Sequence, residues 1–269
     1  MSELLIGYDV ECVNEGKTKG INVDFLKKMK MIHEELNAPC TLFCRGQTIE
    51  SNMEGFQEIR KNSLFDIQQH TYSHVLFKTI LRKTENGVEY VRGGSLEQIY
   101  EEVEKTNRIL KGYLDVDCIG ITGPYTYYRG LQDRPDILEI LHELGIRFMR
   151  TYGRNAEDSF PVSMDIHPFW YDIQGFSDVL EFPITGWKGE YFEGFTDYVK
   201  SNIDYIAGRN LSYSYLHHDF SYVLSPVKDP ELHHIREIII YAQKKGVEIL
   251  SYKESYIRRL KEKEKKRCL

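Results

Sequence analysis

LLIGYDV at residues 4–10 and CTLFC at residues 40–44 are short apolar runs with the length of buried strands. Between them, residues 24–36 carry one apolar stripe at helical spacing, made of Phe25, Leu26, Met29, Ile32 and Leu36. A strand, a helix and a second strand in this order favour a parallel β/α unit with a right-handed crossover. These residues therefore predict the first unit of a parallel α/β fold.

The same alternation continues along the chain. Further strands are expected at residues 64–68, 118–122, 146–150, 179–182, 211–216 and 247–250. Further helices are expected between them. Ser95 (the first residue of a capping box), Pro135 and Asp229 mark helix starts, and Gly145 and Gly246 mark helix ends.

Alternation over residues 1–269 predicts a single α/β domain, a distorted parallel (β/α) barrel of about seven strands. In such barrels the site lies where the strands end. Residues 151–178 lack periodicity, so we expect a long loop that shapes the pocket. Residues 257–267 are dense in Lys, Arg and Glu and are interpreted as a solvated helix end.

Composition excludes several classes of protein. Hydrophobic residues make up 41% of the chain, charged residues 28%, and the net charge is −6, so no basic groove for nucleic acid is expected. No stretch reaches the ~18 apolar residues of a membrane-spanning helix. The N-terminus lacks the basic lead and cleavage site of a signal peptide, so we expect a cytoplasmic protein. The five cysteines show no framework spacing and are expected to be reduced thiols.

Polar side chains follow two of the expected strands. Asp9 and Glu11 are two residues apart at the end of the first strand, so an extended chain points them the same way. Two carboxylates placed so need a cation or a proton between them, unless they are solvated in a turn. His70 and His74 follow the third strand, and on a helical turn their i, i+4 spacing would let both bind one ion. A chance occurrence of this spacing is the alternative.

A third polar group, Leu216-His217-His218-Asp219, ends a late strand. A histidine there could act as an acid or base, because the ordinary pKa of histidine lies near neutrality. The alternative is a histidine that only pairs with Asp219. His233-His234 falls inside an expected helix and is interpreted as packing or surface.

Together these groups resemble the motifs of the metal-dependent polysaccharide deacetylase family, a carbohydrate esterase type. The resemblance is carried by Tyr8-Asp9-Val10-Glu11 as first motif, His70-Thr71-Tyr72-Ser73-His74 as second motif (H-S/T-x-x-H), Leu180-Glu181-Phe182-Pro183 with Trp187 as fourth, and Tyr215-Leu216-His217 as fifth. The family's β/α barrel agrees with the fold predicted above.

The resemblance implies a metal site and a base. Asp9 would be the base, and Glu11, His70 and His74 would bind one divalent ion. Zinc is expected first, with cobalt, nickel or iron as alternatives that suit the same donors. The ion would polarise an amide carbonyl and activate water.

The remaining roles follow from the later motifs. His217 would protonate the leaving amine, with His218 as the alternative one residue along. The backbone N–H of Tyr125 would stabilise the oxyanion. Trp187, with several tyrosines, would form a wall for a sugar ring.

The third motif departs from the family. Its usual R-x-P-Y is here Thr122-Gly123-Pro124-Tyr125, so Thr122 stands where an arginine would hold the base. Arg129, Arg150 and Arg154 are the candidates to replace it. We favour Arg150, because it ends an expected strand and a strand end directs a side chain better than a loop does.

The expected activity is metal-dependent hydrolysis of an N-acetyl or N-formyl group on a carbohydrate or sugar derivative. The alternatives are a hydrolase of a non-sugar carbon–nitrogen bond other than a peptide bond, and a non-catalytic carbohydrate-binding barrel. The expected partner is a small-molecule or oligosaccharide substrate, without nucleic acid or membrane insertion. The oligomeric state is left open.

Overall fold

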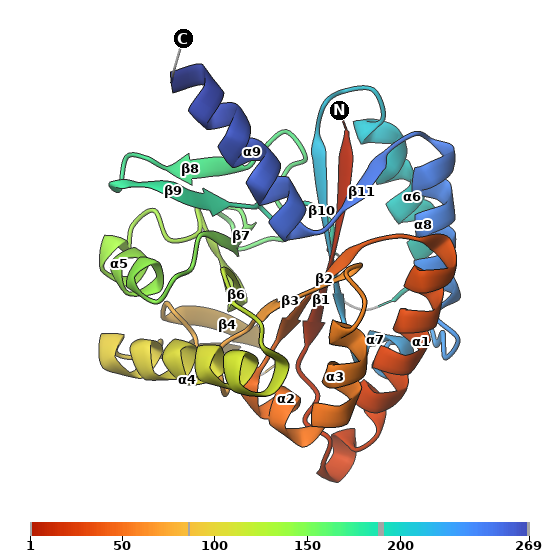
Figure 1. The fold of residues 1–269 in the computed structure, drawn as a ribbon, viewed down its shortest axis with the longest axis horizontal. Helices are drawn as coiled ribbons and strands as arrows, with labels where there is room; N and C mark the ends of the chain where they lie inside the picture. The colour runs from red at the N-terminus through yellow and green to blue at the C-terminus, as the bar shows by residue number, and fades with distance from the viewer. Residues whose placement is uncertain (1, 86, 188–190, 268–269) are drawn as a thin grey trace.

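The computed structural model of the chain describes residues 2–85, 87–187 and 191–267 (Figure 1). Across these ranges, seven strands run parallel in the order β10-β1-β2-β3-β6-β7-β9. They are β1 (Glu3–Val10), β2 (Cys40–Cys44), β3 (Phe65–Gln69), β6 (Gly120–Tyr128), β7 (Phe148–Arg154), β9 (Phe176–Glu181) and β10 (Ser212–His218). The predicted α/β class, with a mainly parallel array of strands, is confirmed.

Four shorter strands complete the sheets. β8 (Phe169–Tyr171) lies antiparallel to β9, and β11 (Glu248–Leu250) pairs in parallel with the start of β1. β4 (Ile80–Thr84) and β5 (Gly87–Val91) form a separate antiparallel pair.

Helices lie around the parallel strands. Figure 1 shows α1, α3, α6 and α8 along one side of the strands and α4 and α5 along another. Their bounds are α1 (Ile21–Leu36), α2 (Gly46–Ser51), α3 (Met53–Arg60), α4 (Leu96–Leu114), α5 (Pro135–Glu143), α6 (Phe195–Ile206), α7 (Ser221–Leu224), α8 (His233–Lys244) and α9 (Tyr252–Arg267). A short 3-10 helix, η1 (Gly16–Thr18), precedes α1.

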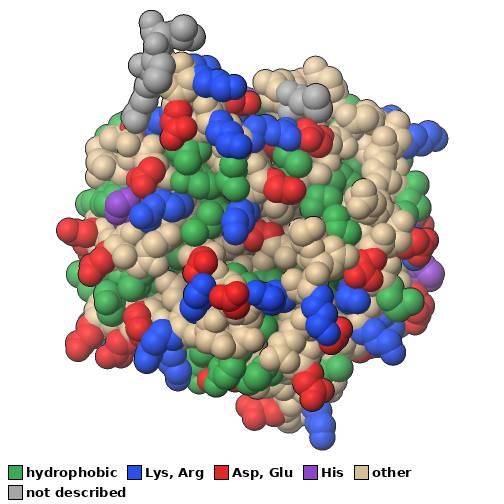
Figure 2. Space-filling model, viewed as in Figure 1, with side chains coloured by type: hydrophobic (Ala, Val, Ile, Leu, Met, Phe, Trp, Pro, Cys, Tyr) green, Lys and Arg blue, Asp and Glu red, His purple; other side chains and the backbone are tan. Residues whose placement is uncertain are grey.

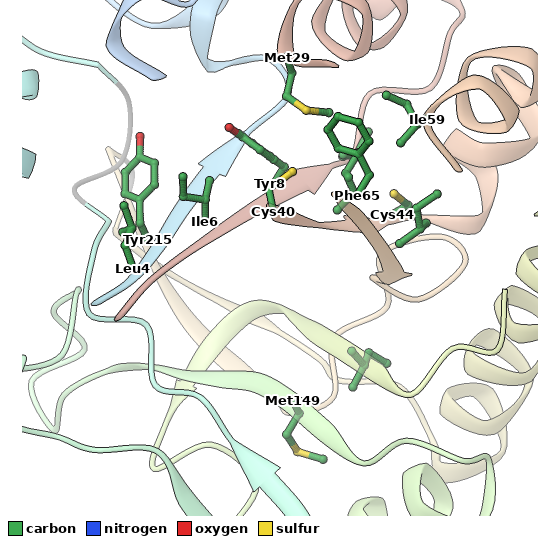
Figure 3. Close-up of a cluster of buried hydrophobic side chains, with 14 of the residues drawn as sticks. Leu4, Ile6, Tyr8, Met29, Cys40, Cys44, Ile59, Phe65, Met149 and Tyr215 are labelled. Atoms are coloured by element: carbon green, nitrogen blue, oxygen red, sulfur yellow. The ribbon is translucent and has the colours of Figure 1, made fainter. Parts of the chain in front are cut away.

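The two faces of the strands bury two separate apolar layers. In β1, Leu4, Ile6 and Tyr8 pack toward the helices, as Figure 3 shows with Met29 of α1 close to Tyr8. Leu5 belongs to a second, inner cluster, whose other buried members are Phe43, Phe148, Leu180, Phe182, Leu250, Tyr252 and Tyr256. Since successive strand residues point to opposite faces, Gly7 and Asp9 share the inner face with Leu5.

The two ends of the parallel array approach each other. The N–H of Gly186 donates to the carbonyl of Ser214 at 2.9 Å, and the N–H of Leu216 donates to the carbonyl of Gly186 at 3.0 Å. This parallel bridge joins the segment after β9 to β10, the strand at the other end of the array. The strands thus curve around the inner cluster, as in a distorted β/α barrel.

Some expected boundaries are wrong. β7 continues to Arg154, so the aperiodic stretch of residues 151–178 holds the end of β7, all of β8 and the start of β9. Arg150 therefore lies inside a strand and not at its end. α8 begins at His233 and not at Asp229, because the Asp229 carboxylate accepts hydrogen bonds from the N–H groups of His233 and His234 at 2.9 and 2.8 Å.

Other elements were not expected from the sequence: α2, α3, α6 and the β4–β5 pair. The tail at residues 257–267 is helical, as interpreted, within α9. Cys12, Cys40, Cys44 and Cys118 are buried free thiols, and Cys268 lies outside the described residues. Among the described helices, none is both long and apolar enough to span a membrane.

Candidate active site

The polar residues singled out above come together at the C-terminal ends of the strands. β1 and β10 pair in parallel so that Asp9 lies opposite His218 and Tyr8 lies opposite His217. Glu11 follows β1 directly, and His70 follows β3. The parallel array thus brings residues more than two hundred positions apart to one edge, as expected for a β/α fold.

Three of these side chains converge on one point. Oε1 of Glu11 lies 3.0 Å from Nε2 of His70 and 3.2 Å from Nε2 of His74. All three donor atoms lie within 4.8 Å of one another. His70 is buried, whereas Glu11 and His74 are half-buried and reachable from solvent.

The segment that carries the two histidines is a loop and not the helical turn expected from their spacing. Thr71 and His74 both have left-handed backbones, with φ of 59° and 73°. The hydroxyl of Thr71 holds the loop, because it accepts hydrogen bonds from the N–H groups of His74 and Val75 at 3.1 and 3.2 Å. Ser73 donates its N–H and hydroxyl to Glu102 of α4 at 2.6 and 2.7 Å.

The chemistry of this donor set fits a divalent cation. Nδ1 of His70 donates to the carbonyl of Thr122 at 2.9 Å, which leaves Nε2, 3.0 Å from Oε1 of Glu11, as the nitrogen that would bind an ion. Burial alone would raise the pKa of Glu11, but hydrogen bonds from His70 and His74 hold that pKa well below its usual range. Two imidazoles and one carboxylate are a set that zinc prefers, with space for further ligands.

Asp9 is held by an arginine from across the array. Arg150 is fully buried, and its Nη2 donates to Oδ1 of Asp9. Its Nε donates to the hydroxyl of Thr122 at 3.2 Å, and its guanidinium carbon lies 4.5 Å from the ring centre of Phe43. Thr122, which occupies the position of the expected arginine, is thus a contact of the arginine that reaches Asp9.

The other two arginine candidates do not reach Asp9. Arg129 is exposed and donates to Gln132 at 3.0 Å. Arg154 donates to the carbonyl of Asp158 at 2.9 Å, and its guanidinium carbon lies 3.9 Å from the ring centre of Tyr125.

The two histidines of the late strand face opposite ways. Nε2 of His218 lies 3.8 Å from Oε1 of Glu11, and its ring stacks on Phe220 at 4.8 Å between centroids. His217 is buried in the helix-facing layer, where its Nε2 contacts the hydroxyl of Tyr191 and burial lowers its pKa well below the ordinary value. The preference for His217 over His218 as the acid therefore does not fit, because strand alternation turns His217 away from the site.

Aromatic rings border the site on the side of His218. The half-buried ring of Trp187 lies 5.5 Å from that of His218, edge to face. Phe160 stacks on Trp187 at 4.3 Å, and the guanidinium carbon of Arg154 lies 4.9 Å from the ring of Phe160. Arg154 also contacts the ring of Tyr125, so these residues form a connected row of side chains, of which the sequence had indicated Trp187 together with unspecified tyrosines.

Open hollows adjoin Glu11 and His74. Glu11 borders one of about 660 Å³ together with Cys12, Arg45 and Phe220. His74 borders another of about 600 Å³ that Arg92 also lines. On the face drawn in Figure 2, basic and acidic side chains are interspersed.

Sequence reasoning missed the roles of three residues that act on the site through others: Arg45, Glu102 and Asp219, the last considered only as a partner of a histidine. The buried Asp219 carboxylate accepts hydrogen bonds from the N–H groups of Glu11 and Cys12, at 3.2 and 3.0 Å, and so holds the segment after β1. A polar residue directly after a strand was the available signal for Arg45 and Asp219. Glu102 lies in mid-helix, where no local signal separates it from an ordinary exposed glutamate.

Known proteins resemble this chain in sequence and in fold. The family model described as polysaccharide deacetylase matches residues 17–149, a range that includes His70 and His74. No protein of a curated set matches the sequence.

Solved structures share the fold at low identity. A candidate polysaccharide deacetylase from Mycobacterium smegmatis is 15% identical with a TM-score of 0.72, over 97% of this chain and 91% of that one. Puue allantoinase is 13% identical with a TM-score of 0.67, over 94% and 88%. A CE4-family pseudoenzyme from Bacillus anthracis is 12% identical with a TM-score of 0.58, over 95% and 65%.

Proposed function

The chain belongs to the polysaccharide deacetylase family, and on this premise we propose that it is a metal-dependent hydrolase that removes an N-acetyl or N-formyl group from a carbohydrate or sugar derivative. One observation carries the proposal: Glu11, His70 and His74 converge beside an aspartate held by a buried arginine. A divalent ion, with zinc as the first candidate and cobalt, nickel or iron as alternatives, would be held by Glu11, His70 and His74. When bound, the ion supplies Lewis acidity toward the amide carbonyl and toward water.

The remaining chemistry belongs to the side chains. Asp9 accepts a proton from the attacking water, and Arg150 fixes the direction of that carboxylate through a planar, charged fork. His218, whose Nε2 lies 3.8 Å from Oε1 of Glu11, donates a proton to the leaving amine. The wall of Tyr125, Phe160 and Trp187 packs against the sugar ring, and the backbone N–H of Tyr125 is proposed to face the oxyanion.

Metal content and turnover of two variants test the proposal. Asp9→Asn is expected to bind one zinc ion per chain after reloading, as the wild type does, and to lose about 10²–10⁴-fold in turnover, because the amide cannot accept a proton. Glu11→Gln is expected to lose the zinc. Elemental analysis and hydrolysis of N-acetyl and N-formyl hexosamines are the measurements. Wild-type turnover in Asp9→Asn would remove the base from the mechanism.

A second candidate is hydrolysis of a non-sugar carbon–nitrogen bond, favoured by the fold shared with an allantoinase. Assays of cyclic ureides beside acylated hexosamines separate the two enzyme functions. The third candidate is a non-catalytic carbohydrate-binding barrel, which is considered because the fold resembles that of a pseudoenzyme. A zinc-loaded protein that hydrolyses neither class of substrate would favour it.

A further inference from the structure

We propose that the hollow beside Glu11 is a subsite for an anionic group of the substrate, a carboxylate or a phosphate monoester, and that Arg45 recognises it. The inference rests on the proposed function, since it names a class of substrate for the same site. The subsite lies between the segment after β1, the end of β2 and the segment after β10.

Arg45 is held in place by neutral acceptors. It follows β2 directly, and its Nη1 donates to the carbonyl of Glu11 at 3.0 Å, while Nη2 donates to the side-chain oxygen of Gln47 at 2.5 Å. A guanidinium has five N–H donors, so these bonds orient the group without using it up. The buried Nε of Arg45 has no hydrogen-bond partner among the described residues.

The charge of Arg45 is also without a counterion. Other arginines of this chain lie against carboxylates: Arg134 on Asp136, Arg236 on Glu35 and Arg258 on Glu248, each within 2.7 Å. Within the part of the chain that the structure describes, no carboxylate oxygen lies within ion-pair distance of Arg45. A half-buried, oriented and unneutralised guanidinium favours a planar anion as its partner.

The rest of the hollow suits an anion attached to a larger molecule. Most of its lining is uncharged: Cys12, Val13, Gly16, Thr18, Phe220 and Leu224. Glu15 is the one acidic neighbour besides Glu11 in the described lining, and it is exposed.

The position of the hollow sets where the anionic group must lie on the substrate. Glu11 borders the hollow with its side chain pointed at His70 and His74, and Arg45 binds the backbone carbonyl of the same residue. Under this proposal, one substrate molecule carries both the group bound by Arg45 and the amide presented to Glu11, His70 and His74. The substrate class is an N-acylated compound that also carries a carboxylate or a phosphate.

Calorimetric titration tests the subsite without turnover. Glucose 6-phosphate, glucuronate and glucose are titrated into zinc-loaded wild type, Arg45→Gln and Arg45→Lys proteins, each with its unfolding midpoint recorded. Both anionic probes, or the phosphate alone, are expected to bind the wild type about tenfold or more tightly than glucose. Arg45→Gln is expected to erase this difference, and Arg45→Lys to keep part of it, because the charge remains but the fork is lost.

The matched control is Arg92→Gln, which removes an arginine from the hollow beside His74 and is expected to keep the wild-type preference. Arg45→Gln binding the anions as tightly as wild type, or no preference for anions in the wild type, overturns the subsite. The titration is repeated on metal-free protein. Loss of anion binding in the absence of zinc would show that the anion binds only to the metal, and this would also overturn the subsite. Failure of every hydrolysis assay would contradict the proposed function. The binding results would still test the anion subsite, because the titrations do not depend on turnover.

Discussion

Arg150 reaches Asp9 across the inside of the strand array because the residues along its path are small. A Cβ atom added at Gly7 would lie 2.5 Å from Nη1 of Arg150 and 3.3 Å from the ring of Phe43. Thr122 is short enough to lie beside the guanidinium and receive a hydrogen bond from it. A long side chain at either position would occupy the volume that the arginine now fills. Two small residues thus permit a buried cation to orient the proposed base.

Gly7→Ala is expected to displace the guanidinium of Arg150 and lower turnover by about tenfold to a hundredfold, since a misplacement of about 1 Å can cost that much. Zinc content should stay at the wild-type level, because the atoms nearest to the added methyl group belong to Arg150, Tyr252 and Phe43 and not to the proposed metal ligands. Turnover and elemental analysis are the measurements. Gly112→Ala in α4 is the control, as its added Cβ meets nothing within 4 Å. Unchanged turnover in Gly7→Ala would show that Arg150 does not need its present position.

His218→Ala is expected to lose about 10²–10⁴-fold in turnover with little change in the free energy of unfolding. His217→Ala is expected to lower that free energy by about 1–3 kcal/mol, because it leaves the buried hydroxyl of Tyr191 without its partner. Activity of folded protein and urea unfolding separate the two effects. This order reverses the expectation drawn from Tyr215-Leu216-His217. A larger loss of turnover in His217→Ala than in His218→Ala would restore it.

At the scale of elements, the loop after β3 depends on α4. Its left-handed residues Thr71 and His74 would be strained without outside support, because non-glycine residues avoid positive φ. Glu102 of α4 supplies that support through two hydrogen bonds to Ser73, between the two histidines. The helix therefore helps to aim both imidazoles.

Glu102→Ala is expected to weaken zinc binding about tenfold or more, the range found for groups that orient ligands. Glu102→Gln should recover part of the affinity, because its amide oxygen still accepts from the N–H of Ser73. Competition with a chelator measures the dissociation constants. Glu104→Ala is the control, since Glu104 pairs with Arg108 of the same helix and not with the loop after β3. Equal zinc affinity in Glu102→Ala and wild type would show that the loop holds its shape alone.

For the molecule as a whole, one buried carboxylate joins three strands near the end of the parallel array. Oε1 of Glu181 in β9 accepts from the N–H groups of Thr151 and Tyr152 in β7, at 2.5 and 2.8 Å. Oε2 accepts from the hydroxyls of Thr151 and of Tyr171 in β8, both at 2.7 Å. Burial raises the pKa of Glu181 to about 7 in spite of these donors.

This raised pKa predicts how stability depends on pH. The ordinary value is 4.5, so between pH 4.5 and 7 the folded protein keeps a proton that the unfolded chain releases. The contribution of Glu181 is therefore present at low pH and is lost as pH rises, by up to about 3 kcal/mol. Glu181→Gln is expected to lessen this slope without abolishing it, because burial raises the pKa of Asp219 to about 7 as well. Denaturant unfolding at several pH values measures it, with the exposed Glu139→Gln as control. A slope as steep in Glu181→Gln as in the wild type would assign it to other groups.

The sequence by itself determined the class of fold and the groups at the strand ends. Periodicity of apolar residues is local, so the runs at residues 4–10 and 40–44 and the stripe between them can be recognised without the rest of the chain. Parallel strands end at one edge of the array, so Asp9, Glu11 and His70 could be expected together before any distance was known. Short or largely polar elements such as α2, α3 and the β4–β5 pair lack such a signal and were missed.

Only the tertiary structure decided how these groups face one another. Strand alternation puts His217 and His218 on opposite sides, but the parallel register with β1 is what places His218 opposite Asp9. Arg150 was the favoured partner of Asp9 for the wrong reason, since it reaches inward from mid-strand through space left by Gly7. The unneutralised charge of Arg45 depends likewise on which carboxylates the fold leaves out of reach. The strand register, the reach of the Arg150 side chain and the neutralisation of Arg45 all depend on contacts between segments that are distant in the sequence. No local pattern in the sequence encodes such contacts.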